Sequence, residues 1–311
     1  MVSKGMAELS LEAFEGLDLA SARRLIPPWL GAFVAGPPEH AALSERAAAD
    51  VIDGLSDDQI SDALHCLATT GAEYGFYAAD PAARALTRAY MGSITAQSPV
   101  VGVERLRSAM DKGPVLLLCN HLAYCDTVFK DLALVRAGAP DLAERLIAIA
   151  GPKVYDTPFR RMASLVIGTI KTAQSTAIAH SKSELTPRQV AEIAVGTVRL
   201  AQAKMREGGL VVLYGEGSRS RDQRFGPFIK AIRKYAQFEG ALLVPVALSN
   251  IDQLMPVGQH QMHHGSGSMQ IGEGISVDEF GAMDAIFQAW GQIADMLPEH
   301  HKPHAHVSCW G

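Results

Sequence analysis

The chain has 311 residues, of which 48% are hydrophobic and 20% charged, so it can bury a large core and wholesale disorder is excluded. The net charge of −5 excludes the broad basic surface of a typical nucleic-acid-binding protein. No apolar run reaches the roughly 18 residues of a membrane-spanning helix. No basic segment followed by an apolar stretch opens the chain, so we expect no secretory signal and a cytoplasmic location. A peripheral contact with a membrane stays open.

Residues 1–98 predict a small N-terminal helical bundle without a convincing strand. Ser56 precedes two aspartates, and Asp80 precedes a proline, which are both typical of helix starts. Residues 1–100 hold 6 Lys+Arg and 13 Asp+Glu, whereas residues 101–311 hold 22 and 20. The C-terminal part is therefore the better candidate for binding an anion.

Residues 99–311 predict an α/β domain, because short apolar runs alternate with helical segments. Ser276 starts a capping box that predicts a last helix reaching Met296. This alternation indicates a mixed, largely parallel sheet flanked by helices, with ligands beyond the carboxyl ends of the strands. The runs predict strands over 114–119, 147–150, 210–213 and 242–246, and the segments between them predict helices over 127–137, 187–207 and 228–238.

The first candidate site follows the apolar run that ends at Cys119. Asn120 and His121 come directly after it, and Asp126 lies five residues beyond the histidine. Histidine is the usual proton acceptor near neutral pH, and a carboxylate commonly fixes its tautomer. The alternative is an ordinary surface pair in which Asp126 caps the helix that starts at Thr127.

The second candidate site follows the predicted strand over 210–213. Between Gly215 and Lys234 there are six basic and two acidic residues, and arginine binds phosphate through its planar fork of donors. A solvated basic loop is the alternative. The glycine spacing matches neither a P-loop nor a dinucleotide-binding motif. The residues of interest are Glu216, Gly217, Ser218, Arg219 and Arg221.

Together, these segments resemble the glycerol-phosphate and lysophospholipid acyltransferase superfamily. Asn120-His121 with Asp126 matches its NHxxxxD block, and residues 216–221 look like its EGxRSR block, in the same order and at a similar spacing. Residues 244–246 are similar to its proline-containing block, and Lys153 falls where the remaining block belongs. The surroundings are most similar to the soluble type with an N-terminal helical domain. Tyr214-Gly215 departs from the Phe-Pro or Phe-Val pair that is usual there.

The resemblance implies a glycerolipid acyltransferase of phospholipid biosynthesis. The donor would be an acyl thioester, acyl-CoA or acyl carrier protein, and the acceptor glycerol 3-phosphate or 1-acylglycerol 3-phosphate. His121 would be the general base and Asp126 its partner. A catalytically silent lipid- or phosphate-binding member is the alternative. No metal or cofactor is implied. The substrate-binding residues would be Asn120, Lys153, Glu216, Gly217, Ser218, Arg219 and Arg221.

Three other features have competing interpretations. Cys119 and Cys125 flank His121 and suit a thiol nucleophile, but buried core cysteines are favoured. Residues 162–170 suit a membrane or acyl-chain contact beside Arg160 and Arg161, but a buried strand is favoured. The histidines near the C-terminus lie beside prolines, so we expect them to be exposed rather than to bind a metal. The histidines considered are His260, His263, His264, His300, His301, His304 and His306.

Overall fold

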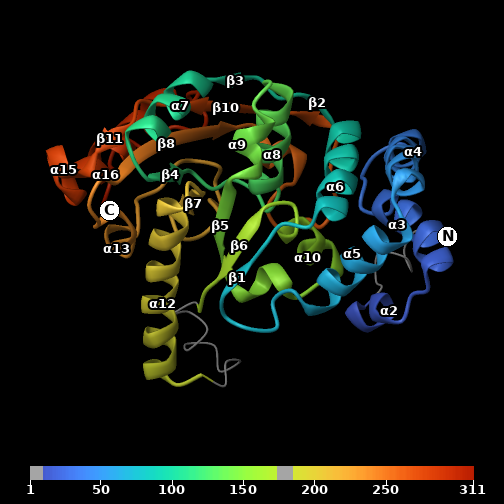
Figure 1. Cartoon of the computed structure of the whole chain (residues 1–311). Coiled ribbons are helices and arrows are strands. Elements are labelled where there is room, and N and C mark those ends of the chain that lie inside the picture. The colour runs from blue at the N-terminus through green and yellow to red at the C-terminus, as the bar shows by residue number, and fades with distance from the viewer. Residues whose placement is uncertain (1–9, 174–184) are drawn as a thin grey trace.

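The computed structural model describes residues 10–173 and 185–311, which are arranged as Figure 1 shows. The first nine residues, over which no secretory signal is predicted, lie outside the described part. A mixed, largely parallel sheet is flanked by helices, as the sequence predicts. Within the described ranges, no helix is both long enough and apolar enough to cross a membrane.

The main sheet of the described part has nine strands, with β1-β6-β5-β7-β4-β8-β10-β3 as the order and β11 paired to β8. The five strands from β6 to β8 in this order are parallel, whereas β1 and β10 are antiparallel to β6 and β8. A second, small sheet pairs β2 with β9. The strands are β1 (Phe76–Tyr77), β2 (Thr95–Gln97), β3 (Val100–Val101), β4 (Val115–Cys119), β5 (Leu146–Ala150), β6 (Gly168–Lys171), β7 (Leu210–Tyr214), β8 (Leu242–Ser249), β9 (Gly265–Ser266), β10 (Ser268–Ile271) and β11 (Ile275–Ser276).

The central strand β4 is buried on both faces. Val115, Leu117 and Cys119 pack into one hydrophobic cluster, while Leu116 and Leu118 pack into the other. Parallel strands that are covered on both faces have continuous apolar sequences. This explains why the apolar runs predict β4, β5, β7 and β8 correctly.

Helices cover both faces of the sheet, and in Figure 1 the helices α2 to α5 gather to one side of it. The predicted helix starts at Ser56 and Asp80 are confirmed, because each side chain accepts a hydrogen bond from the first turn. The helices are α2 (Leu11–Glu15), α3 (Leu19–Gly31), α4 (Pro38–Gly54), α5 (Asp57–Thr69), α6 (Pro81–Ile94), α7 (Val103–Lys112), α8 (Asp126–Arg136), α9 (Pro140–Glu144), the 3₁₀ turn η1 (Pro152–Tyr155), α10 (Pro158–Ser164), α12 (Pro187–Arg206), α13 (Ile232–Ala236), α14 (Ile251–Leu254), α15 (Val277–Phe280) and α16 (Ala282–Met296).

Several elements differ from the sequence predictions. The N-terminal part contains the short strands β1 and β2, which are too short to leave a periodic pattern. The helix predicted over 228–238 covers only Ile232–Ala236. The last predicted helix is divided into α15 and α16 at Gly281, whose φ of 76° is not helical. Of residues 162–170, only the last three are in a strand, β6.

The tail that follows α16 also differs from its prediction. His301, expected to be exposed, has no exposed surface. His304 and His306 are exposed, as expected.

Helix α6 links the N-terminal helices to the α/β part, because it packs against both α4 and α8. Asp131 of α8 is fully buried, and its carboxylate accepts two hydrogen bonds, at 2.7 and 2.8 Å, from Arg88 of α6. The hydrogen bond to Asp131 raises the pKa of Arg88. Nε of Arg84 lies 3.8 Å from the same carboxylate. A domain boundary at residue 98 stays a prediction, since one hydrophobic cluster includes residues from both sides of it.

We expect Arg88→Met to destabilise the protein by about 3 kcal/mol, because it leaves a buried carboxylate with only the more distant Arg84 as a partner. Urea unfolding measures this change. Arg107→Met is the matched control, since Arg107 makes the same two-bond contact with Asp141 in an exposed position. The control should lose much less stability. Equal losses in the two variants would contradict the importance of the buried pair.

Candidate active site

The two predicted motifs lie side by side because the strands that precede them are parallel neighbours. Cys119 at the end of β4 is paired in register with Tyr214 at the end of β7. The N–H of Gly215 donates to the carbonyl of Cys119 at 3.0 Å, and the N–H of Ser220 donates to the carbonyl of His121 at 2.9 Å. The carboxyl ends of the strands thus bring together residues that are about a hundred positions apart in sequence.

His121 and Asp126 form the hydrogen-bonded pair that the sequence predicts. Nδ1 of His121 lies 2.8 Å from Oδ2 of Asp126. The aspartate is fully buried and also accepts from the backbone N–H groups of Leu122 and Ala123, at 2.7 and 2.9 Å. It therefore holds the loop rather than capping α8. The pair fixes the proton on Nδ1 and leaves Nε2 available to accept another.

A buried polar cluster supports the His121 ring. The ring of Tyr214 stacks on it, with the centroids 4.0 Å apart. The Tyr214 hydroxyl contacts Thr127 and accepts a hydrogen bond from Nζ of Lys130 at 2.8 Å. Lys130 is only 1% exposed. Sequence reasoning missed Lys130 and noted Tyr214 only as a departure from the family, although a tyrosine at the end of a buried strand signals a buried polar partner.

Glu216 ties the two loops together. Its Oε2 accepts from the N–H of His121 at 2.7 Å, and its Oε1 accepts from the N–H of Gly226 at 2.9 Å. Burial raises the pKa of Glu216 to about 7, in spite of these two hydrogen bonds. Gly217 follows with a φ of 69°, and a Cβ there would lie 2.9 Å from Ile229. The turn therefore requires glycine.

Arg219 and a second arginine meet on one aromatic ring. The guanidinium carbon of Arg219 lies 3.5 Å from the centroid of the Tyr124 ring, and that of Arg160 lies 4.5 Å from it. Nη1 of Arg219 is buried and has no hydrogen-bond partner among the described residues. Tyr124 belongs to the loop between His121 and Asp126, so this ring places a guanidinium beside the histidine loop.

The other predicted binding residues are less constrained. Lys153, Ser218 and Arg221 have exposed side chains, and none of the three side chains makes a hydrogen bond or ion pair within the described part. The carbonyl of Lys153 accepts a hydrogen bond from Arg160 at 3.3 Å. Arg160 thus connects η1 to Tyr124. The sequence placed Arg160 close to the block of Lys153 but did not single it out as a site residue.

Asn120 joins the site to β8. Its amide nitrogen donates to the carbonyl of Leu248 at 2.9 Å, and its oxygen accepts from the N–H of Leu248 at 2.8 Å. The side chain is 1% exposed. This two-bond contact continues the pairing of β4 with β8 beyond Cys119, the last paired residue of β4. The geometry indicates a supporting role for Asn120.

The cysteines beside His121 are buried and free. Burial raises the pKa of Cys119 to about 11 and raises that of Cys125 well above its ordinary value. Both thiols stay protonated near neutral pH, which disfavours them as nucleophiles. Among the residues that the structure describes, no group of three or more His, Cys, Asp or Glu side chains is placed to hold a metal ion.

The family comparison covers this whole site. Residues 98–249 match the model of the acyltransferase family. These residues form an acyltransferase domain. The matched residues include β4, β7, β8 and both motifs, so the resemblance noted in the sequence is confirmed.

Among solved structures, the chain is similar to the 1-acyl-sn-glycerophosphate (LPA) acyltransferase PlsC from Thermotoga maritima. The TM-score is 0.43 and the sequence identity 13%, over 69% of this chain and 82% of that chain. No curated protein matches the chain.

The raised pKa of Glu216 predicts a pH-dependent stability. Because the pKa is about 7 when folded and 4.5 ordinarily, the folded state binds this proton more tightly, and the free energy of unfolding falls as the pH rises between these values. The loss is on the order of 3 kcal/mol. Glutamine does not titrate, so thermal unfolding from pH 4.5 to 8 should show the wild-type Tm falling relative to that of Glu216→Gln. The exposed Glu239→Gln is the control. Parallel curves of Tm against pH for the wild type and Glu216→Gln would refute the raised pKa of Glu216.

Proposed function

We propose that the chain is a glycerolipid O-acyltransferase. It moves an acyl group from a thioester, acyl-CoA or acyl carrier protein, to a hydroxyl of glycerol 3-phosphate or 1-acylglycerol 3-phosphate in phospholipid biosynthesis. The observation that supports this most strongly is the Nδ1–Asp126 contact of His121, in a loop whose Tyr124 ring bears the guanidinium of Arg219. The loop after β4, which carries the base, and the loop after β7, which carries the anion-binding group, thus meet at Tyr124.

In the proposed reaction, Nε2 of His121 takes the proton from the acceptor hydroxyl as its oxygen attacks the thioester carbonyl. The C–S bond breaks when the tetrahedral intermediate collapses, and the imidazolium returns the proton to the departing thiolate. Asp126, which is buried beside Nδ1, stabilises the imidazolium. General base assistance of this kind contributes roughly 10²–10⁴-fold to the rate. No covalent enzyme intermediate is required.

The acceptor phosphate is assigned to Arg219, whose Nη1 has no partner among the described residues. Lys153, Ser218 and Arg221 are further candidates, because their exposed side chains are available to a ligand. Asn120, Glu216 and Gly217 support the two loops through the contacts and the turn described above. Binding the phosphate would place the hydroxyl at His121, which is the advantage of a positioned substrate.

A cytoplasmic location completes the proposal. A 1-acylglycerol 3-phosphate acceptor is a lipid, so its use would bring the chain into peripheral contact with a membrane.

His121→Ala should lower acceptor-dependent acyl transfer by at least about 10²-fold, because it removes the base. Release of free thiol from acyl-CoA, measured with and without glycerol 3-phosphate or its 1-acyl derivative, reports this transfer. His65→Ala, at an exposed position on α5, is the control and should be fully active. Full activity of His121→Ala would contradict the assignment of His121 as the base. If the wild type binds acyl-CoA or the acceptor but releases no thiol in response to the acceptor, a catalytically silent lipid- or phosphate-binding protein would be favoured.

Arg219→Ala should chiefly raise KM for the phosphorylated acceptor, by roughly 10–100-fold, because a charged hydrogen-bonding group is lost. Steady-state kinetics with glycerol 3-phosphate and with unphosphorylated glycerol separate this effect from general damage, since only the phosphorylated acceptor should be affected. Arg199→Ala, exposed on α12, is the matched control. An unchanged KM for glycerol 3-phosphate would remove the phosphate role from Arg219.

A further inference from the structure

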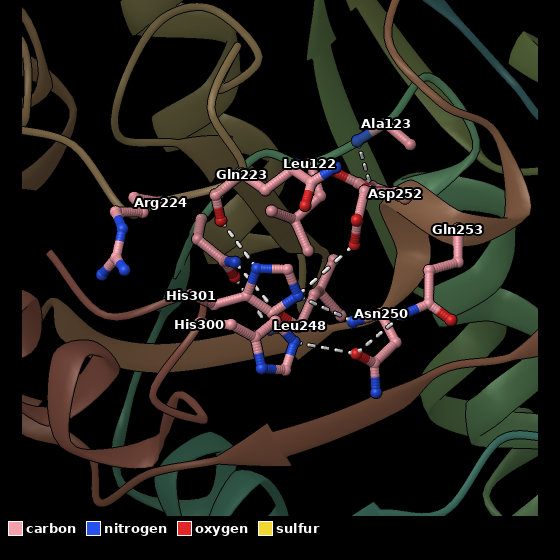
Figure 2. A network of polar contacts seen from close by, with 12 residues as sticks. Leu122, Ala123, Gln223, Arg224, Leu248, Asn250, Asp252, Gln253, His300 and His301 are labelled. Atoms are coloured by element: carbon pink, nitrogen blue, oxygen red, sulfur yellow. Dashed lines mark hydrogen bonds and ion pairs between the residues drawn. The ribbon is translucent and has the colours of Figure 1, made fainter.

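His301 lies in the tail that follows α16, yet its side chain is fully buried. The tail turns there, because the N–H groups of His301 and Lys302 both donate to the carbonyl of Pro298. The carbonyl of His301 accepts from the N–H of Phe225 at 2.9 Å. The imidazole is thereby held between the loop that carries the arginines and the end of β8 (Figure 2).

The imidazole bonds to the backbone on both sides. Nδ1 lies 2.6 Å from the carbonyl oxygen of Gln223, which can only accept, so Nδ1 donates. The N–H of Asn250 donates to Nε2 at 3.1 Å, and Oδ1 of Asp252 lies 3.3 Å from Nε2 (Figure 2). If Nε2 is protonated, Asp252 offers it an acceptor. Nδ1 carries a proton whether or not Nε2 does, so the bond from Nδ1 to Gln223 persists in either protonation state. Burial lowers the pKa of His301, but Asp252 and the Gln223 carbonyl outweigh it and raise the pKa overall.

Both backbone partners have an unusual conformation. Gln223 and Asn250, with φ of 67° and 64°, are the two non-glycine residues with positive φ in the described part of the chain. A left-handed conformation costs a residue with a side chain roughly 1–2 kcal/mol. Such conformations persist where surrounding contacts hold them. One imidazole contacts the backbone of both residues, so it is placed to stabilise both.

Each of these two residues belongs to a segment that contacts the His121 loop. Gln223 lies four residues after Arg219 and three after Ser220, whose N–H bonds to the carbonyl of His121. Asn250 lies two residues after Leu248, which pairs with the Asn120 amide. His301 therefore bridges the arginine loop, residues 218–225, and the residue that follows the end of β8.

We propose that His301 is a positioning residue that holds the arginine loop, and with it Arg219, in register with His121. This inference rests on the proposed function for its kinetic consequence, but not for its structural one. Other ties between the tail and the loop exist. Asp222 pairs with His304 at 3.0 Å in an exposed position, and Arg224 donates to the carbonyl of Lys302. The carbonyl of Gln223 is the point at which the fully buried His301 ring is attached to the loop.

Two substitutions test the hydrogen bonds of the two imidazole nitrogens separately. His301→Asn keeps an N–H close to the position of Nδ1 and so keeps the bond to Gln223. His301→Gln keeps an acceptor close to the position of Nε2 and so keeps the bond to Asn250. We expect His301→Gln to raise KM for glycerol 3-phosphate about tenfold, the effect of one lost hydrogen bond, with kcat changed much less. His301→Asn should keep KM within about threefold, although both variants lose one bond and some thermal stability.

A second measurement does not depend on acyl transfer. Trypsin cleavage after Arg219, Arg221 and Arg224, followed by mass spectrometry without substrate, reports the opening of the arginine loop. His301→Gln should be cleaved there several times faster than the wild type and His301→Asn. His304→Gln, which removes the exposed contact with Asp222 and the ring contact with His306, is the matched control and should resemble the wild type in both measurements.

Unchanged cleavage in His301→Gln would overturn the proposal, and so would equal changes of KM in His301→Gln and His301→Asn, which indicate only a general loss of stability. Faster cleavage with an unchanged KM would also overturn it. Faster cleavage of His301→Gln in a protein whose wild type transfers no acyl group would support the anchoring of the loop and refute the proposed function. The two failures are therefore distinguishable.

Discussion

The site depends on the pairing of β4 with β7. These strands are parallel neighbours, so the chain leaves both at the same edge of the sheet, and Cys119 lies beside Tyr214 there. Side chains alternate between the two faces of a strand, so a slip of one residue would exchange the faces of β4. Both faces of β4 are apolar and buried, so such a slip would change which side chains meet in each of the two hydrophobic clusters. The large area of apolar contact on both faces therefore fixes the position at which His121 leaves the sheet.

Beyond the sheet, buried carboxylates organise the loops. Asp126 closes the His121 loop on itself, and Glu216 joins that loop to the loop after β7. In each case the oxygens accept from backbone N–H groups, which satisfies polar groups that would otherwise be buried without partners. Asp126, to which the proposed reaction gives a chemical role, thus also determines the backbone of its loop. Catalysis and loop structure are consequently difficult to separate by substituting a single carboxylate.

The sequence predicted the parts of this structure that depend on local pattern. Continuous apolar runs revealed β4, β5, β7 and β8, and the motif order placed His121 and Arg219 at one edge of the sheet. Contacts between distant side chains left no such pattern. The meeting of Arg160 with Arg219 on Tyr124 depends on where η1 and α10 lie. Lys130 looked like an ordinary helix residue until the structure placed it under Tyr214.

The tail after α16 is a second case in which contacts between distant residues could not be predicted from the sequence. Its prolines and histidines suggest exposure, but His301 inserts between segments that lie 51 and 78 residues earlier in the sequence. No local composition reports such a contact. The strands β1, β3, β9 and β11 have only two residues each, so their pairing is likewise decided by the tertiary structure rather than by periodicity.

The position of His301 in the chain has a consequence for biosynthesis. The sheet, the His121 loop and the arginines are all translated before the tail that contacts Gln223 and Asn250. During translation, β8 is complete before residue 301 is added, so the contacts of the His121 loop can form before His301 reaches the arginine loop. If His301 holds the arginine loop as proposed, that loop would reach its final position only once the tail has packed against it.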